Sequence, residues 1–290
     1  MKHAYLIIAH NQFSILQRLL SCLDDRRNDI YIHFDKKVKK IPVLKVLYSR
    51  LFVLDERADV RWADVSQIQS EFILFQAAFN NGPYAYYHTL SGVDMPLKSQ
   101  NEIHDFLKSH DGKEFIGYTQ GDISKEIDRK VKRYHLFSRF FRADSTYFFS
   151  LFRLLRFALL RFQYLFIIQR HRGVDFKKGT SWVSVTQTFV EFLLPHYKEV
   201  MKMYKYTFCA DEIFLQTICW NSLFRDRLYD PNNEGRGSMR MIGWRNNQLV
   251  DWEDKDFDIL MNSDALFARK FDTKHIEVVD RILKKITSYD

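Results

Sequence analysis

The chain of 290 residues contains little cysteine. Its three cysteines, Cys22, Cys209 and Cys219, are odd in number and have no spacing typical of a metal site. Because this set cannot build a disulfide framework, we expect a reducing compartment. The apolar run after Met1-Lys2-His3 is too short for a signal peptide and lacks a cleavage site. The sequence therefore predicts a cytoplasmic location.

Several motifs that carry chemistry are missing as well. There is no glycine-rich phosphate loop of the dinucleotide or P-loop kind, and no serine lies in a nucleophile elbow. The histidines lack metal-ligand spacing, and we interpret His33, His88 and His135 as structural residues. No Asp-x-Asp triplet ends a predicted strand, since Asp254 and Asp256 lie in a polar segment. If the chain binds a nucleotide diphosphate, side-chain cations must neutralise the phosphates.

The composition is that of a globular protein. Hydrophobic residues make up 46% and charged residues 28% of the chain, and phenylalanine is common at 26. The net charge of +8 favours anionic partners, which include nucleotide diphosphates, nucleic acid and anionic membranes. No internal repeat or low-complexity segment is present.

Strand-like and helix-like segments alternate over the first hundred residues. Apolar runs predict buried strands at 4–9 and 30–34, and helical spacing predicts a helix at 13–23 between them. The other predicted elements are strands at 51–54, 60–62 and 84–90 and a helix at 66–79. Two pairs have capping-box spacing, Ser66 with Gln69 and Ser99 with Glu102. This order predicts an α/β fold with a mostly parallel central sheet flanked by helices.

Two aspartates follow predicted strands of this sheet. Asp35 comes directly after 30–34, and Asp94 lies shortly after 84–90. Ligands of parallel sheets bind at the carboxyl ends of the strands, so both residues are candidates for substrate contacts. The alternative is that each aspartate is a helix cap or turn former.

The alternation breaks at about residues 120–172, where we expect an insert rich in basic and aromatic side chains. Residues 125–142 are strongly basic, and residues 145–169 form a dense Phe/Leu segment. On a helix, one side of that segment would carry Arg153, Arg156 and Arg161. These arginines are too frequent for a membrane-spanning helix. We predict an amphipathic helix at a membrane interface, and the alternative is a helix buried against the core.

The alternation resumes after Gly173. The predicted elements are a strand at 180–185, a helix at 186–205 broken at Pro195, a helix at 211–223, a strand at 239–244 and a helix at 273–287. Asp211 and Glu212 lie at the start of one of these helices. Two adjacent carboxylates in a first turn can simply stabilise the helix, or one of them can serve as a proton acceptor. Arg240 and Lys270 are the best-placed cations for a diphosphate, and the alternative for each is a surface charge.

The order and spacing of several segments resemble the core-2/I-branching β-1,6-N-acetylglucosaminyltransferase family, which also contains peptide O-xylosyltransferases. The segments are AYLIIAHNQFSILQRLL, IYIHFD, YYHTLSGVDMPLKSQNEI, GTSWVSVTQTFVEFLL, ADEIFLQTI, SMRMIGW and LFARKFD. The resemblance covers nearly the whole chain apart from the 120–172 insert. It implies a single domain at 1–290 with a GT-A-like fold, inversion at the sugar carbon and no metal or other cofactor. The animal members are Golgi membrane proteins with paired cysteines, so this chain resembles a bacterial, cytoplasmic branch.

The resemblance also implies roles for individual residues. Glu212 is expected to be the catalytic base, with Arg240 and Lys270 at the donor diphosphate. Asp35 and His10 are expected at the nucleotide. The resemblance carries over no acceptor residues. From the residues themselves, sugar or acceptor contacts are expected at Asp94, Trp182, Asp211 and Trp244, where the indoles offer aromatic faces to a pyranose ring.

The function we predict is transfer of N-acetylglucosamine from UDP-GlcNAc to a glycan hydroxyl, of the β-1,6 branching type, in surface polysaccharide or lipid-linked oligosaccharide assembly. UDP-xylose is the rival donor. A rival of another class is a non-catalytic basic module that binds anionic lipid or nucleic acid through residues 125–172. Expected partners are the UDP-sugar, a glycan or lipid-linked acceptor, and a membrane surface contacted through 145–169, but no nucleic acid. The enzyme would then work at the inner face of the cell membrane.

Overall fold

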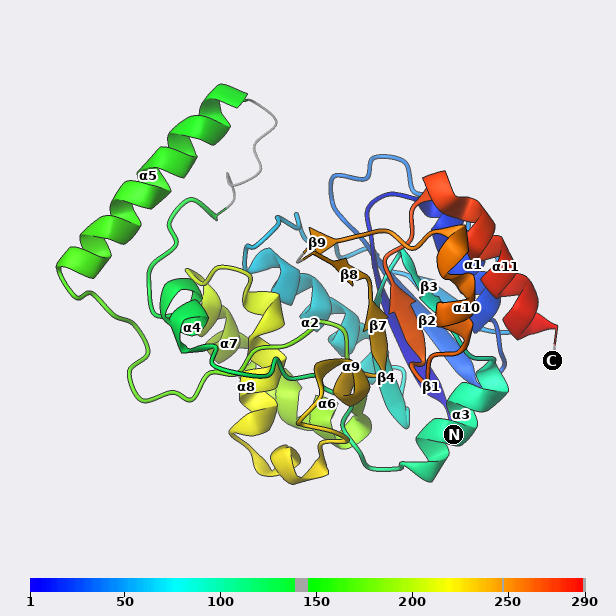
Figure 1. Ribbon diagram of the computed structural model, residues 1–290. Coiled ribbons are helices and arrows are strands. Elements are labelled where there is room, and N and C mark those ends of the chain that lie inside the picture. Colours follow the sequence, from blue (N-terminus) through cyan, green and yellow to red (C-terminus); the bar gives the residue numbers. More distant parts are fainter. Residues whose placement is uncertain (139–145, 247, 289–290) are drawn as a thin grey trace.

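A five-stranded sheet forms the centre of the computed structural model, which describes residues 1–138, 146–246 and 248–288 (Figure 1). Its strand order is β3-β2-β1-β4-β6. The bounds are β1 His3–Ala9, β2 Asn28–Phe34, β3 Arg50–Val53, β4 Tyr86–Ser91 and β6 Ser184–Thr186. The first four strands run parallel, and β6 pairs antiparallel with β4. The carboxyl ends of β1, β2 and β4 therefore meet at one edge.

Two smaller sheets adjoin this one. The first has the order β5-β10-β7, with β5 Asp94–Pro96, β10 Phe267–Arg269 and β7 Arg240–Ile242. The second is a hairpin of β8 Trp244–Arg245 and β9 Gln248–Leu249. Because β5 follows β4 after two residues, the three-stranded sheet starts at the carboxyl edge of the central sheet.

Helices cover both faces of the central sheet (Figure 1). On one side lie α1 Phe13–Leu23, α3 Gln100–Ser109, α10 Phe257–Met261 and α11 Ile276–Thr287. On the other lie α2 Ser66–Phe79, α6 Gln187–Leu193, α7 Tyr197–Tyr204 and α8 Phe214–Trp220. The remaining helices are α4 Ser124–Lys130, α5 Thr146–Leu165, α9 Glu234–Ser238 and the 3-10 turns Leu194–His196, Ala210–Glu212, Leu223–Arg227, Asp254–Asp256 and Thr273–His275.

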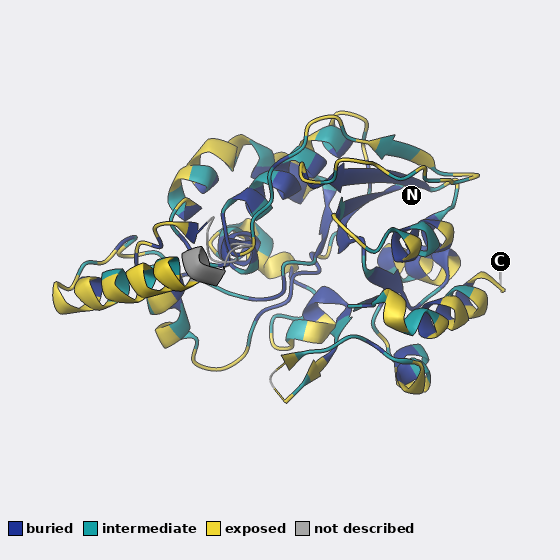
Figure 2. Cartoon of the chain, turned by 90° about the horizontal axis from the view of Figure 1, so that it is seen from above, coloured by how far each residue is buried: buried dark blue, intermediate teal, exposed yellow. Residues whose placement is uncertain are grey.

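The central strands are apolar on both faces because each face has its own core. In β1, Tyr5 and Ile7 pack with α1 and α11, whereas Ala4 and Leu6 pack with α2 and α6. Figure 2 shows these strands as the buried layer of the molecule. The predicted α/β fold with a mostly parallel sheet between helices is confirmed. The single-domain assignment stays a prediction.

Two details of the predicted pattern are wrong. Residues 60–62 form no strand. The helix at 66–79 has the predicted bounds but no Ser66–Gln69 capping box. Asp64 takes that place, since its Oδ1 accepts the backbone N–H of Ser66 at 3.0 Å, while Ser66 Oγ accepts from the Arg61 N–H. The capping box at Ser99 and Glu102 is confirmed.

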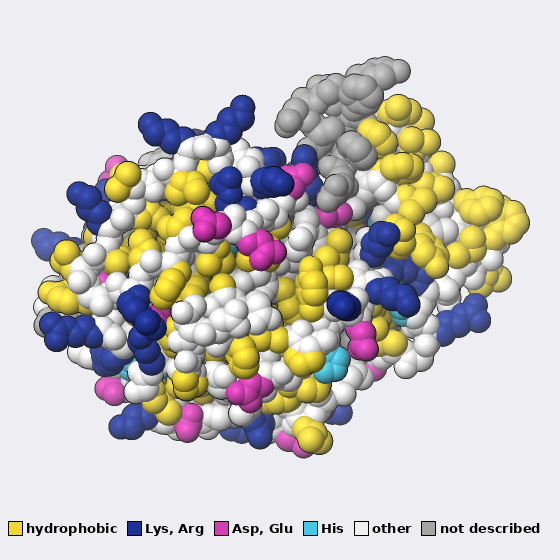
Figure 3. All heavy atoms as spheres, turned by 180° about the vertical axis from the view of Figure 1, so that it is seen from behind, with side chains coloured by type: hydrophobic (Ala, Val, Ile, Leu, Met, Phe, Trp, Pro, Cys, Tyr) yellow, Lys and Arg dark blue, Asp and Glu magenta, His cyan; other side chains and the backbone are white. Residues whose placement is uncertain are grey.

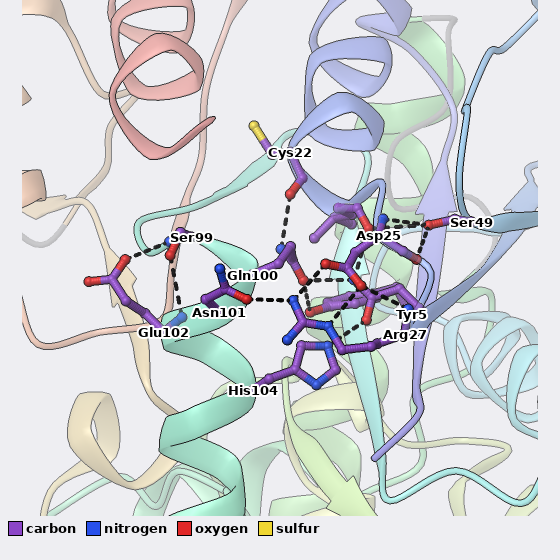
Figure 4. A network of polar contacts seen from close by, with 12 residues as sticks. Tyr5, Cys22, Asp25, Arg27, Ser49, Ser99, Gln100, Asn101, Glu102 and His104 are labelled. Atoms are coloured by element: carbon purple, nitrogen blue, oxygen red, sulfur yellow. Dashed lines mark hydrogen bonds and ion pairs between the residues drawn. The ribbon is translucent and has the colours of Figure 1, made fainter. Parts of the chain in front are cut away.

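The start of α3 is tied to the central sheet by a buried amide (Figure 4). Gln100 accepts hydrogen bonds at Oε1 from the Tyr5 hydroxyl and from Asn28 Nδ2, and its Nε2 donates to the Cys22 carbonyl. His104, one turn further along α3, also contacts Asn28, at 2.9 Å from Oδ1. Every polar atom of this junction that is buried needs such a partner, so the contacts fix how α3 lies against the sheet.

Helix α5, the longer of the two helices in the insert, protrudes from the body of the protein (Figure 1). Arg153 and Arg161, two of the three arginines predicted to share one side, are exposed. Arg156 does not share that side, because its guanidinium carbon lies 4.2 Å from the centroid of the Phe208 ring on the body. The three arginines are too widely spread around the helix to face one way. No helix among the described residues is long and apolar enough to cross a membrane.

Candidate active site

Glu212 lies in a cluster of four charged side chains. Its Oε2 is 3.0 Å from Lys130 Nζ and 3.7 Å from Lys178 Nζ. Both lysines also contact Glu126, at 2.8 and 3.6 Å. Although burial favours the neutral amine, the carboxylates of Glu212 and Glu126 raise the pKa of Lys130. The cluster therefore favours a charged lysine beside a half-exposed Glu212 carboxylate.

Asp211 points away from this cluster into the protein. Its Oδ2 accepts hydrogen bonds from Ser181 Oγ at 2.9 Å and from Gln67 Nε2 at 3.1 Å. Burial, together with the negative charge of Glu212, raises the pKa of Asp211 to about 6. The two adjacent carboxylates thus have different surroundings. Glu212 is partly exposed to solvent and paired with lysines, whereas Asp211 is buried. They lie in the 3-10 turn before α8 rather than at its start, which corrects the predicted helix bounds.

Gly179 holds the neighbouring segment against Glu212. Its N–H donates to the Glu212 carbonyl at 2.9 Å. A Cβ at this position would lie 1.8 Å from the carbonyl oxygen of Gly117, which excludes any larger residue unless the backbone moves. The close approach sets the course of the segment from Lys178 to Trp182.

Arg269 connects the far end of that segment to a buried carboxylate. Its guanidinium carbon lies 4.7 Å from the Trp182 ring centroid, and its Nε is 3.4 Å from Asp94 Oδ1. Burial raises the pKa of Asp94, and the charge of Arg269 works against that rise. Asp94 also accepts hydrogen bonds from the N–H and the hydroxyl of Ser91, at the end of β4.

Lys270 follows Arg269 at the end of β10. Its Nζ is 3.2 Å from Asp251 Oδ1, and about a third of its side chain is exposed. The β8–β9 hairpin begins beside it, since the Gly243 N–H donates to the Arg269 carbonyl. Trp244 lies on that hairpin and is exposed over 62% of its surface. The backbones that precede Trp244 and Lys270 are therefore hydrogen-bonded to each other.

Arg240 lies in the core, with 3% of its surface exposed. It donates to the carbonyls of Ser238 and Val183 and to Ser184 Oγ, and its guanidinium carbon lies 4.3 Å from the Phe267 ring centroid. Burial lowers the pKa of Arg240 to about 9. Its part in diphosphate binding stays a prediction, which requires the side chain to leave these contacts.

His10 and Asp35 follow the carboxyl ends of β1 and β2, and for Asp35 the strand pattern predicts this place. The Asp35 N–H donates to the Ala9 carbonyl, which brings the two loops together. Asp35 is buried, and its carboxylate accepts from the backbone N–H and from Nζ of Lys37. His10 is exposed. Gln12, two residues after His10, donates to Asp272 at 2.7 Å, so this edge also reaches the Lys270 segment.

The structure therefore brings most of the predicted residues to one edge of the central sheet. Glu212 and Asp211 contact the segment 178–182, Trp182 contacts Arg269, and Arg269 contacts Asp94. Sequence reasoning missed Lys130 and Lys178, and it considered Arg269 only as the neighbour of Lys270 in a basic pair. Lys178 directly precedes the segment GTSWVSVTQTFVEFLL, which could have indicated it. Lys130 lies in the insert, and no local pattern connects it to Glu212.

No metal cluster marks this edge in the described part of the chain. No group of three or more His, Cys, Asp or Glu side chains that could hold a metal ion occurs among those residues. A cavity of about 750 Å³ is lined by Tyr229, Arg236 and the predicted site residue Arg240, and a second of about 840 Å³ lies beside Asp25 and Tyr48. Charged and aromatic side chains at the strand ends define the candidate site.

Comparison with known proteins identifies the family. A family model described as "Branch: Core-2/I-Branching enzyme" matches residues 3–267. The chain belongs to this family. It is 25% identical to xylosyltransferase 2 of Homo sapiens over 303 aligned residues, which cover 97% of this chain and 33% of that protein. The chain therefore spans about a third of the length of the xylosyltransferases that it matches.

Two further likenesses are to mouse proteins. The chain is 23% identical to the N-acetyllactosaminide beta-1,6-N-acetylglucosaminyl-transferase of Mus musculus, over 93% of this chain and 68% of that protein. Among solved structures, the apo form of mouse xyloside xylosyltransferase 1 superposes with a TM-score of 0.35 and 9% identity, covering 94% and 99% of the two chains.

Proposed function

We propose that this protein is an inverting glycosyltransferase that moves N-acetylglucosamine from UDP-GlcNAc to a glycan hydroxyl. Membership of the Core-2/I-Branching enzyme family supports the reaction class. The likeness to a β-1,6-N-acetylglucosaminyl-transferase supports the donor and the linkage type. The likeness to xylosyltransferase 2 supports UDP-xylose as the second candidate donor.

One observation carries the assignment of the site. The candidate base is Glu212, and the candidate diphosphate clamp is the pair of consecutive cations Arg269 and Lys270. The five residues from Lys178 to Trp182 connect the two, since Lys178 contacts Glu212 and Trp182 contacts Arg269. Four residue steps of extended chain span at most about 14 Å. The Glu212 carboxylate and the clamp are thus held close together, because they contact the two ends of one short segment. Gly179 fixes the course of that segment.

The proposed chemistry is a single displacement. Glu212 accepts the proton of the acceptor hydroxyl as the hydroxyl oxygen bonds to the anomeric carbon of the donor sugar. The bond from that carbon to the diphosphate oxygen breaks, its electron pair stays with the UDP, and the configuration inverts. Lys270 and Arg269 stabilise the negative charge that gathers on the departing diphosphate. We propose that this charge stabilisation needs no metal ion.

The other predicted site residues are proposed to contact the nucleotide and the two sugars. Asp35 and His10 are proposed at the nucleotide, at the ends of β2 and β1. Asp94 and Asp211 are proposed at the sugars, and Trp182 and Trp244 as aromatic faces for a pyranose ring. Asp94 is bound to Arg269, so a sugar hydroxyl at Asp94 would lie beside the clamp.

We also propose where the reaction takes place. The acceptor is a glycan or a lipid-linked glycan of a surface polysaccharide pathway, and residues 145–169 contact the membrane peripherally at its inner face. The three cysteines are free and buried, which suits the reducing cytoplasm.

The test is UDP release from a panel of UDP-sugars, with and without excess EDTA. The proposal expects UDP-GlcNAc or UDP-xylose to be turned over, with water or an added glycan as acceptor, at a rate that EDTA leaves unchanged. Loss of activity that Mn²⁺ or Mg²⁺ restores would overturn the metal-free mechanism. A chain that neither binds UDP nor releases it from any donor would favour the rival function, a non-catalytic basic module.

A further inference from the structure

The helix α5 presents one face to the body and leaves the other to solvent. Gln163 anchors it, since its Oε1 accepts the Tyr134 N–H at 2.6 Å and its Nε2 donates to the Tyr134 carbonyl at 3.0 Å. Arg156 packs over Phe208 on the same inner face. Because these contacts fix the rotation of the helix, the residues on the opposite side stay exposed.

That outer face is apolar and unusually exposed. Large apolar side chains with more than half of their surface exposed are Leu154, Phe157, Phe162, Leu165, Phe166 and Ile167. Figure 3 shows hydrophobic side chains gathered on the protruding part of the molecule, with Lys and Arg beside them. Contiguous exposure of this kind marks an interaction surface rather than a protein face that stays in water.

The positive charge of the segment around α5 indicates which kind of partner this surface binds. Residues 145–174 include five arginines and no Asp or Glu. Arg153, Arg161 and Arg172 are exposed, and the guanidinium carbon of Arg161 lies 5.1 Å from the Phe157 ring centroid. Cations beside an apolar helix face complement anionic headgroups above acyl chains.

A second copy of the chain fits this surface less well. Pairing of two such helices would bring arginines against arginines, and the segment has no carboxylate to separate them. We propose that the outer face of α5 and the following residues Phe166 and Ile167 lie in the interface of an anionic lipid bilayer. The helix is about 30 Å long and would lie flat on the bilayer.

Co-sedimentation of the full chain with lipid vesicles tests this contact. Vesicles of phosphatidylcholine with phosphatidylglycerol should bind the protein at low salt, and binding should weaken at high salt and on pure phosphatidylcholine. The double variant Leu154→Ser, Phe162→Ser should lower the bound fraction at least about tenfold. Leu223→Ser is the matched control, because Leu223 is 89% exposed but lies far along the chain on the turn Leu223–Arg227, and binding should not change.

Two results would overturn the proposal. One is protein that stays in the supernatant with anionic vesicles at low salt. The other is a dimer, detected by light scattering, which the double variant dissociates while vesicle binding stays absent. UDP release from the donor in solution is measured in parallel, because the double variant should leave it unchanged. The membrane contact and the glycosyltransferase reaction can therefore fail independently.

Discussion

Lys130 Nζ lies 3.0 Å from Glu212 Oε2, although the two residues are 82 positions apart in the chain. Lys130 is nearly buried and belongs to α4, in the basic insert, whereas Glu212 belongs to the acidic pair before α8. The insert is therefore not an independent appendage. It supplies the nearest cation to the proposed catalytic base.

Replacing Lys130 by Met should lower turnover. The variant loses the cation that lies 3.0 Å from the Glu212 carboxylate, so the proposed base is no longer held by this ion pair and turnover should fall several-fold. Lys130→Arg keeps the charge and should keep most of the activity. Turnover is measured by UDP release, with thermal unfolding as the check on the fold. A folded Met variant that turns over at the wild-type rate would reduce Lys130 to a structural role.

Replacing Lys270 by Ala should weaken UDP binding about tenfold or more, since a charged hydrogen bond to phosphate is lost. The affinity is measured by titration calorimetry in the presence of EDTA. Lys274→Ala is the control, because Lys274 is an exposed lysine four residues further on. Equal affinities for all three proteins would remove Lys270 from the proposed clamp.

Three buried histidines in mutual contact, His3 on β1, His88 on β4 and His104 on α3, should make the fold sensitive to acid. The His3 ring lies 3.9 Å from that of His104, and His88 Nε2 is 3.3 Å from His3 Nδ1. Burial lowers the pKa of His3 and His88 well below the ordinary range and that of His104 to about 4. Between pH 6.5 and 4 the unfolded chain binds more protons, so the free energy of unfolding should fall as the pH is lowered.

His104→Gln tests that contribution. The amide can still donate to Asn28 Oδ1 but does not titrate. The loss of unfolding free energy between pH 6.5 and 4, measured in urea, should become shallower by up to about 1.4 kcal/mol per pH unit. An equal pH dependence in both proteins would show that His104 titrates with its ordinary pKa in the folded state.

The sequence predicts what local patterns decide. The helix at 13–23 has its predicted bounds because its apolar spacing is a property of that segment alone, and the Ser99–Glu102 capping box spans only four residues. Contacts between distant segments cannot be predicted in this way. The burial of Arg240 depends on Val183 and Ser184 of the chain near β6, and the Lys130–Glu212 pair depends on how the insert folds back. No periodicity in the sequence encodes either contact.

The proposed base is tested most directly by Glu212→Gln, compared with Asp211→Asn. The Gln side chain keeps the shape of Glu212 but cannot accept the acceptor proton, so turnover should fall by roughly 10² to 10⁴. Asp211→Asn should keep most of the activity, because an amide oxygen can still accept from Ser181 and Gln67. Both variants are measured by sugar transfer or UDP release at pH 7.5, with thermal unfolding as the check on the fold. A folded Glu212→Gln protein that turns over at the wild-type rate, while Asp211→Asn is inactive, would reverse the assignment and contradict the mechanism.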